Sequence, residues 1–183
     1  MSARHLFTAA IAAAAVASIA ACAGTRTRTS TGETIDDAVI LGSVKSALIS
    51  DPTTDAHEIN VDVNRGVVQL NGFVDSPAEK SRATVVATEV QGVAQVQNNL
   101  QLTQGKQTVG EHFDDAVLTT KVKAAPIESP DTKAHQITVE TSNGVVQLSG
   151  FVNNEQARAA AATVAMSVAG VKSVSNEIAI KSY

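Results

Sequence analysis

Cysteine and aromatic residues are the scarcest components of this 183-residue sequence. It contains one cysteine, no tryptophan, one tyrosine and four phenylalanines. A single cysteine excludes an internal disulfide and any metal cluster that is built from cysteine alone. The shortage of aromatic rings argues against a surface that stacks nucleic-acid bases or sugars. The core must therefore be built mainly from Val, Ile, Leu and Ala.

Long basic runs and catalytic motifs are also missing. The chain has 14 Lys and Arg against 18 Asp and Glu, a formal net charge of −4. Without a row of cations it cannot neutralise a row of phosphates, so we expect no nucleic-acid partner. The sequence has no G-x-S-x-G, phosphate-binding loop, dinucleotide fingerprint or H-E-x-x-H. We expect a protein that binds rather than catalyses, and that holds neither a cofactor nor a metal ion.

The first 21 residues have the pattern of a secretory signal peptide. Arg4 and His5 give a short positive start, and an uncharged, alanine-rich run follows from residue 6 to residue 21. This run is shorter and less apolar than the roughly 20 residues of a membrane-spanning helix. The pattern therefore predicts export from the cytoplasm.

The signal peptide ends in Ile19, Ala20, Ala21 and Cys22, which resembles the bacterial lipobox. In a lipobox the cysteine thiol takes a diacylglyceryl group, and the acyl chains then hold the mature protein at a membrane. We expect lipid attachment at Cys22. The non-acidic Ala23 favours the outer membrane, on its periplasmic side. The alternative is ordinary cleavage nearby, which would leave a soluble periplasmic protein.

The rest of the chain contains one sequence twice. Gly-Val-Val-Gln-Leu-Asn-Gly-Phe-Val begins at Gly66, and Gly-Val-Val-Gln-Leu-Ser-Gly-Phe-Val begins at Gly144, an offset of 78 residues. Asp-Asp-Ala-Val begins at Asp36 and again at Asp114 with the same offset. No gap is needed, and about 30 of some 70 aligned positions are identical. The sequence therefore predicts a duplicated domain.

The repeat sets the expected domain boundaries. Residues 36–103 and 114–183 form the two domains. The polar residues 22–35 are predicted to be the lipidated cysteine and a flexible tether, and residues 104–113 a linker. Domains of about 70 residues bury barely enough apolar surface to fold alone, so we expect the two copies to pack on each other.

Each copy is predicted to fold as helix, strand, strand, helix, strand. Asp36 and Asp114 are the expected N-caps of the first helix in each copy. Residues 143–144, Asn-Gly, are a hairpin turn signal, and residues 76–79, Ser-Pro-Ala-Glu, form a capping box that starts the second helix. The predicted fold class is α+β: two tandem small αββαβ domains, each with a three-stranded mixed sheet covered on one face by two helices.

Two pairs of polar residues at repeated positions are candidates for ligand binding. Asn98 and Asn176 interrupt the apolar face of the last strand, and we favour side chains that bond the backbone at a sheet edge or bulge. His57 and His135 each precede a strand. We favour a structural role for both, because no pattern with metal-ligand spacing accompanies them.

The repeated strings combine an Asp-Asp helix start with a Val-Lys pair at residues 44–45 and 122–123, the Gly-Val-Val-Gln-Leu-x-Gly-Phe-Val segment, and a later Gly-Val with Val-x-Asn. Together they resemble the BON domain family over essentially the whole mature chain. The resemblance implies no catalysis. It implies contact with phospholipid or envelope surfaces, and support of envelope integrity under osmotic or membrane stress.

In lipid-anchored tandem members of the family, the resemblance implies that the first helix of the second domain contacts anionic phospholipid. The corresponding candidates are Thr119, Lys121 and Lys123 on that helix, and Lys172 at the start of the last strand. Each lysine near an anionic surface contributes only about 1 kcal/mol. The other interpretation is that these are ordinary solvated lysines.

Three functions remain open at this stage. The first is a lipid-anchored periplasmic or outer-membrane protein that contacts phospholipid or envelope proteins. The second is a soluble periplasmic stress protein with chaperone-like binding. The third is a module that docks on peptidoglycan or on a secretion channel.

Overall fold

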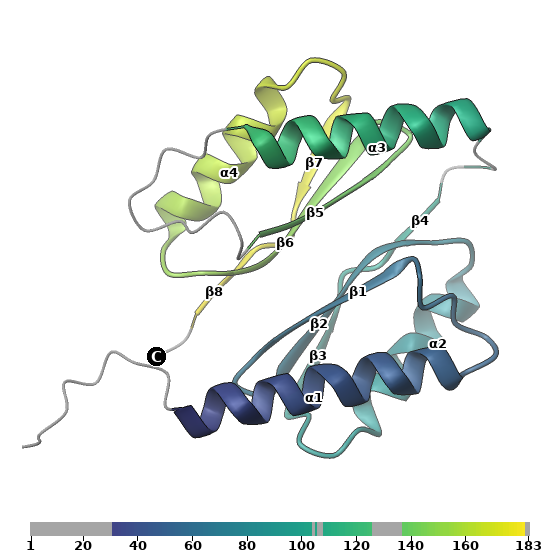
Figure 1. Ribbon diagram of the computed structural model, residues 1–183, viewed down its shortest axis with the longest axis vertical. Coiled ribbons are helices and arrows are strands. Elements are labelled where there is room, and N and C mark those ends of the chain that lie inside the picture. Colours follow the sequence, from purple (N-terminus) through teal and green to yellow (C-terminus); the bar gives the residue numbers. More distant parts are fainter. Residues whose placement is uncertain (1–30, 104, 106–107, 126–136, 182–183) are drawn as a thin grey trace, which may run out of the picture.

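The computed structural model describes residues 31–103, 105, 108–125 and 137–181, which form two similar modules (Figure 1). The elements of the first module are α1 (Thr31–Ser50), β1 (Ile59–Asn64), β2 (Val67–Val74), α2 (Pro77–Thr88), β3 (Gln95–Asn98) and β4 (Gln101–Leu102). The elements of the second are α3 (Val109–Ala124), β5 (Ile137–Ser142), β6 (Val145–Val152), α4 (Glu155–Ser167), β7 (Ser173–Asn176) and β8 (Ala179–Ile180).

Each sheet is built around one long central strand. In the first module β2 pairs antiparallel with β1 and parallel with both β3 and β4. In the second module β6 pairs in the same way with β5, β7 and β8. The predicted α+β fold, with two helices on one face of a mixed sheet, is confirmed. The predicted last strand of each copy is present as two short pieces.

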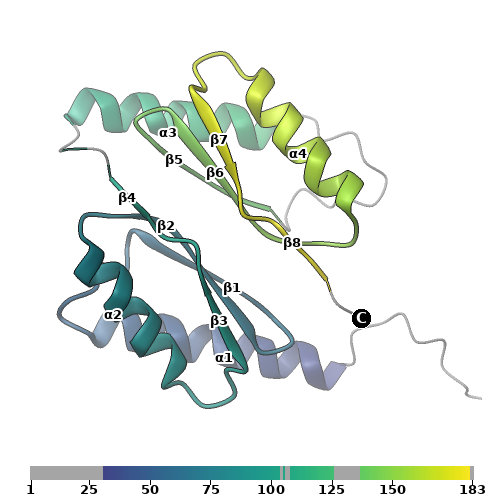
Figure 2. The ribbon, with the colours of Figure 1, turned by 180° about the vertical axis from the view of Figure 1, so that it is seen from behind.

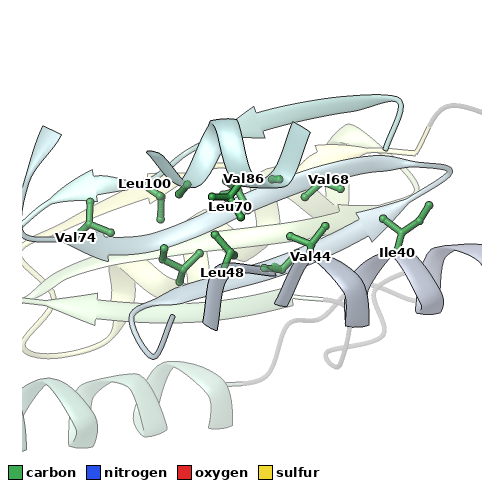
Figure 3. Close-up of a cluster of buried hydrophobic side chains, with 12 residues drawn as sticks. Ile40, Val44, Leu48, Val68, Leu70, Val74, Val86 and Leu100 are labelled. Atoms are coloured by element: carbon green, nitrogen blue, oxygen red, sulfur yellow. The ribbon is translucent and has the colours of Figure 1, made fainter. Parts of the chain in front are cut away.

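The core of each module lies between its helices and one face of its sheet. On α1, Ile40, Val44 and Leu48 recur every four residues, so they share one face of the helix. They pack against apolar side chains of β2, α2 and the β3–β4 segment, among them Val68, Leu70, Val74, Val86 and Leu100 (Figure 3). In the second module α4 contributes only small residues to the core, Ala157, Ala161 and Ala165.

The first helix of each module begins earlier than the sequence indicated. Helix α3 starts at Val109, and its N-cap is Thr108, which forms a capping box with Glu111. Residues 109–113 are therefore helical, although the sequence placed them in a linker. Helix α1 already includes residue 31. The prediction that Asp36 and Asp114 are N-caps is wrong, because both lie inside their helices.

The second aspartate of each Asp-Asp pair stabilises the hairpin turn instead. In the first module Asp37 accepts hydrogen bonds from the backbone N–H groups of Arg65 and Gly66, at 2.7 and 2.9 Å. Both turn residues have positive φ, 53° and 75°, as a type I′ hairpin turn requires. Asp115 makes the same two bonds to residues 143 and 144, at 2.6 and 2.9 Å. These hydrogen bonds hold the first helix of each module against its β-hairpin.

Asn98 explains why the last strand is broken. Its amide donates to the carbonyl of Lys80 on α2 at 2.7 Å, and its carbonyl accepts from Leu100 N–H at 3.0 Å. Asn176 makes the related pair of bonds in the second module, at 2.9 and 3.3 Å. The prediction that both asparagines bond the backbone at a sheet edge or bulge is confirmed for the edge, since β3 and β7 are edge strands. The register is the same before and after the break, so no extra residue is inserted where the parallel ladder is interrupted.

The two modules pack sheet against sheet, with all four helices on the outside (Figures 1 and 2). Strand β2 contacts β5 and β6, and β1 contacts β6. The facing surfaces are polar although they are buried: Gln69, Asn71, Gln147 and Ser149 are each at most 1% exposed. The expected packing between the two copies is therefore present, and hydrogen-bonding side chains form it.

Two glutamines complete the interrupted ladders across this interface. In a continuous parallel ladder the Gly72 N–H would donate to the Asn99 carbonyl. Here the Gln147 side chain lies between them: its Oε1 accepts from Gly72 N–H at 2.6 Å, and its Nε2 donates to the Asn99 carbonyl at 2.7 Å. Gln69 does the same in the second sheet, between residues 150 and 177, at 3.2 and 3.4 Å. We call this pair of contacts the glutamine clasp.

Two acidic side chains are partly buried at related positions of the same interface. Asp62 accepts hydrogen bonds from Thr138, Ser149 and Asn71, at 3.4, 3.5 and 3.2 Å. Burial nevertheless raises the pKa of Asp62, and these hydrogen bonds only partly offset the rise. Burial likewise raises the pKa of Glu140. Each carboxylate therefore destabilises the folded protein when it is charged.

Replacement of Gly72 by alanine is expected to destabilise the protein. Gly72 has a φ of 122°, and an added Cβ would lie 2.1 Å from the carbonyl oxygen of Glu58. We expect Gly72→Ala to lower the free energy of unfolding by at least about 2 kcal/mol, measured by urea denaturation. Gly42→Ala is the control. Gly42 lies in α1 with open space around it, so alanine there should stabilise by roughly 0.5–1 kcal/mol. Equal effects at the two sites would contradict this account.

Removal of the partly buried charge at Asp62 is expected to stabilise the protein at neutral pH. Since the folded state raises the pKa of Asp62, it binds more protons than the unfolded state, and stability falls as pH rises through the folded-state pKa. Asp62→Asn should therefore be more stable than the parent at pH 7, and the gain should shrink towards about pH 4. Urea unfolding over a pH series measures this. Asp36→Asn, on the exposed side of α1, controls for net charge. A gain that is independent of pH would contradict the prediction.

Candidate functional site

The outer face of α3 carries three exposed apolar side chains, two of which are the most exposed large apolar side chains among the described residues of the second module. Val109, Phe113 and Val117 are 88%, 69% and 38% exposed. They recur every four residues, so they lie in one stripe along the helix, and Lys121 continues that stripe by one more turn. The opposite face of α3 is buried against its own module through Leu118 and Val122. We call residues 109, 113, 117 and 121 the α3 stripe.

Two of the four predicted lipid-contacting residues lie elsewhere. The Thr119 hydroxyl donates to the Thr141 hydroxyl on β5 at 2.8 Å, so Thr119 is half-buried against the sheet. The Lys123 ammonium favours the charged form of Glu140 and so partly offsets the rise in pKa that burial causes there. Thr119 and Lys123 therefore interact with the sheet side of their own module rather than with the α3 stripe.

The other two predicted residues, Lys121 and Lys172, line one shallow cleft of about 370 Å³. The alkyl chain of Lys172 lies over the hairpin turn, about 3.1 Å from where a Cβ on Gly144 would be. The same cleft also contains the carboxylates of Glu111 and Asp114. Hydrogen bonds from Thr108 lower the pKa of Glu111, and this side chain contributes a negative charge to the cleft at neutral pH. The cleft therefore offers mixed charge rather than a purely basic surface.

A second cleft, of about 430 Å³, lies at the junction of the modules. Its walls include His57, Glu58 and Phe73 of the first module, and His112 of α3. Burial raises the pKa of Glu58, and the neighbouring carboxylates of Asp75, Asp55 and Glu79 raise it further. His57 thus lies at an inter-module cleft, whereas His135 falls outside the described residues. Within those residues, no group of three or more His, Cys, Asp or Glu is arranged to hold a metal ion.

Sequence reasoning missed the α3 stripe because it started the helix too late. With Asp114 taken as the N-cap, Phe113 preceded the helix and Val109 fell in a linker. With the helix starting at residue 109, the four-residue spacing from Val109 to Lys121 becomes visible. The signal that could have revealed it was Thr108 followed by Glu111, a capping-box pair.

The predicted anchor lies outside the part of the chain that the structure describes. Cys22 and the expected signal peptide precede residue 31. Among the described helices, none has the length and apolar character needed to cross a membrane.

Comparisons with known proteins agree on one family. The model of the BON domain matches residues 36–104 and 114–182. Over 151 residues the chain is 35% identical to the osmotically-inducible protein Y of Escherichia coli, covering 82% of this chain and 75% of that protein. Over 157 residues it is 36% identical to the outer membrane lipoprotein DolP of Haemophilus influenzae, covering 85% and 80%.

Among solved structures, the chain was aligned with the C-terminal domain of CdsD, the structural protein of the type III secretion system of Chlamydia trachomatis. It aligns with a TM-score of 0.32 at 14% identity, covering 80% of this chain and 67% of that one. The family assignment depends instead on the model of the BON domain, which matches each module once, and on the relatives above 30% identity. The chain belongs to the BON domain family, with two BON domains in tandem.

Proposed function

We propose that this protein is an envelope protein that lies on a phospholipid surface through the α3 stripe and is held there by an acyl anchor on Cys22. The observation that carries the proposal is the exposure of Phe113 and Val109 in line with Lys121 on the outer face of α3. Similarity to an outer membrane lipoprotein, DolP, supports the same location. The role is binding in support of the envelope, without catalysis.

The chemistry of the stripe suits the boundary between headgroups and acyl chains. A phenylalanine that moves from water into an apolar layer contributes about 1.5–3 kcal/mol, and a lysine near anionic headgroups about 1 kcal/mol. The acidic Glu111 and Asp114 lie close by and weaken the attraction to anionic lipid. The stripe alone therefore supports only weak, reversible contact.

A weak surface contact becomes useful when a second signal holds the protein at the membrane. One acyl chain gives marginal attachment, and two or more acyl chains give a lasting one. Cys22, at the end of the lipobox-like sequence Ile19-Ala20-Ala21-Cys22, would carry these acyl chains. On this proposal the anchor fixes the protein to the membrane, and the α3 stripe sets which face of the second module meets the lipid.

A soluble periplasmic stress protein is the second candidate. Similarity to the osmotically-inducible protein Y, at 35% identity, favours it about as strongly as the similarity to DolP favours an anchored protein. In that case osmotic shock would release the protein without detergent, and the exposed stripe would bind other proteins rather than lipid.

Vesicle flotation tests the lipid contact. The chain from residue 23 onward keeps every helix and strand that the structure describes but lacks Cys22. We expect it to float with anionic vesicles at low salt, and Phe113→Ala to reduce the bound fraction several-fold because it removes about 1.5–3 kcal/mol of apolar burial. Lys121→Ala should weaken binding mainly at low salt.

Ile49→Ala is the matched control for this assay. Ile49 is 71% exposed, about as much as Phe113, but it lies on α1 of the first module. Its replacement should leave flotation unchanged. Absence of flotation at low salt, or equal losses for Ile49→Ala and Phe113→Ala, would rule out the α3 stripe as the lipid contact.

Mass spectrometry of the mature N-terminus tests the anchor. We expect a chain that begins at Cys22 and carries the mass of two or three acyl chains. We also expect globomycin, which blocks lipoprotein signal cleavage, to cause the precursor to accumulate. Cys22→Ala should release the protein into the soluble periplasmic fraction. An unmodified N-terminus with normal processing under the drug would favour the soluble alternative.

A further inference from the structure

Every bond of the glutamine clasp occurs twice, related by the 78-residue repeat. Gln69 and Gln147 occupy the same repeat position, as do the residues that they bond, Gly150 and Gly72. The two carbonyl acceptors, Asn99 and Glu177, also occupy one repeat position. Each module therefore presents the same donor, the same acceptor and the same inserted carboxamide. A surface with this property is self-complementary, as in a twofold-symmetric dimer.

A second set of contacts obeys the same relation. Thr138 donates to Asp62 at 3.4 Å, and a hydrogen bond from Asn60 favours the charged form of Glu140. Positions 60 and 138 correspond through the repeat, and so do positions 62 and 140. The contacts that are related by the repeat therefore include the neighbouring strands β1 and β5 as well as β2 and β6.

The fully buried residues of the docking face are polar, so the modules can dock and separate without a change in the fold of either module. The apolar cores lie between helices and sheet, on the opposite side of each sheet from the interface. The buried residues of the interface are instead amides and hydroxyls, such as Gln69, Asn71, Gln147 and Ser149. When the modules separate, water can take over these hydrogen bonds without exposure of a core.

We infer that this face is a docking surface for another BON domain, and that it joins two copies of this chain by exchange of modules. In the exchanged dimer the first module of each copy docks on the second module of the other. Each Gln147 completes the ladder of the other copy's first sheet, and each Gln69 that of the other copy's second sheet. The two interfaces of the dimer then contain the same contacts as the single chain.

The link between the modules decides which form is populated. Only residues 103–108 separate β4 from α3. A short link holds two partners at an effective concentration in the millimolar range, so the closed single chain prevails in dilute solution. Exchange becomes competitive at about millimolar chain concentration, or when the link is too short for the modules of one chain to meet.

Removal of residues 104–107 in the chain from residue 23 onward tests the inference. Two residues then remain between β4 and α3, with a reach of about 10 Å. We expect light scattering after gel filtration to give the mass of two chains. The deletion combined with Gln69→Glu and Gln147→Glu should be monomeric at pH 7, since a carboxylate accepts but cannot donate to the carbonyl at residue 99 or 177.

Acidification provides a readout that a packing defect would not give. Protonated glutamate again donates and accepts, so the Glu double variant should recover the dimer at about pH 5. Asp62 and Glu140 also lie in the interface, so the shortened parent is measured at the same pH. The deletion with Gln156→Glu, on the exposed surface of α4, is the control and should remain dimeric at both pH values.

A second experiment leaves the link intact. Chains labelled with heavy and light isotopes are mixed at about millimolar concentration, and native mass spectrometry counts mixed dimers. We expect mixed dimers for the parent and for Gln156→Glu, and none for the Gln69→Glu, Gln147→Glu double variant. A shortened chain that stays monomeric, dimers that persist in the Glu double variant at pH 7, or a parent without mixed dimers would each overturn the inference.

Discussion

The break in the third strand of each sheet leaves a backbone donor and a backbone acceptor that the strand itself does not pair. In the first module these are the Gly72 N–H and the Asn99 carbonyl, and the Gln147 carboxamide of the other module bonds both. A buried N–H without a partner would cost about 1–3 kcal/mol, so the break in the strand and the opposite glutamine depend on each other. The Asn98 side chain maintains the break by bonding α2 and the strand itself. Local strand geometry is thereby coupled to the docking of the modules.

This arrangement determines which surfaces remain available for function. Because the sheets face each other, the helices form the outer surfaces of the molecule (Figures 1 and 2). The two modules differ there more than they do at the interface. Where α3 carries Val109 and Lys121, the related positions of α1 are Thr31 and Ser43, whereas Val117 corresponds to an identical Val39. The interface strands β2 and β6 are almost identical in sequence, whereas the outer helices have diverged. This difference is expected if the second module alone contacts a membrane.

The fold could be predicted from the sequence because its signals are local and duplicated. The hairpin turns, the strand alternation and the role of Asn98 all follow from patterns within a few residues. The helix starts were misplaced because the Asp-Asp pair resembles a cap, whereas Asp37 bonds a turn 28 and 29 residues away. The glutamine clasp could not be predicted from the sequence. The alternating pattern of its strand indicates that Gln69 faces solvent, and its partner at residue 150 is 81 positions away in the sequence. Of the α3 stripe, the sequence predicted only Lys121 as a lipid contact. Phe113 and Val109 could be assigned to the same helix face only once the start of α3 was known.

The central claim is that each glutamine side chain satisfies one backbone amide of the opposite sheet. Amide hydrogen exchange, followed residue by residue by NMR, addresses it most directly. The account predicts slow exchange at Gly72 and Gly150 in the parent, with faster exchange at Gly72 in Gln147→Ala and at Gly150 in Gln69→Ala. The amides of core strand residues such as Leu70 should stay protected in both variants. Unchanged protection of Gly72 in Gln147→Ala would contradict the account.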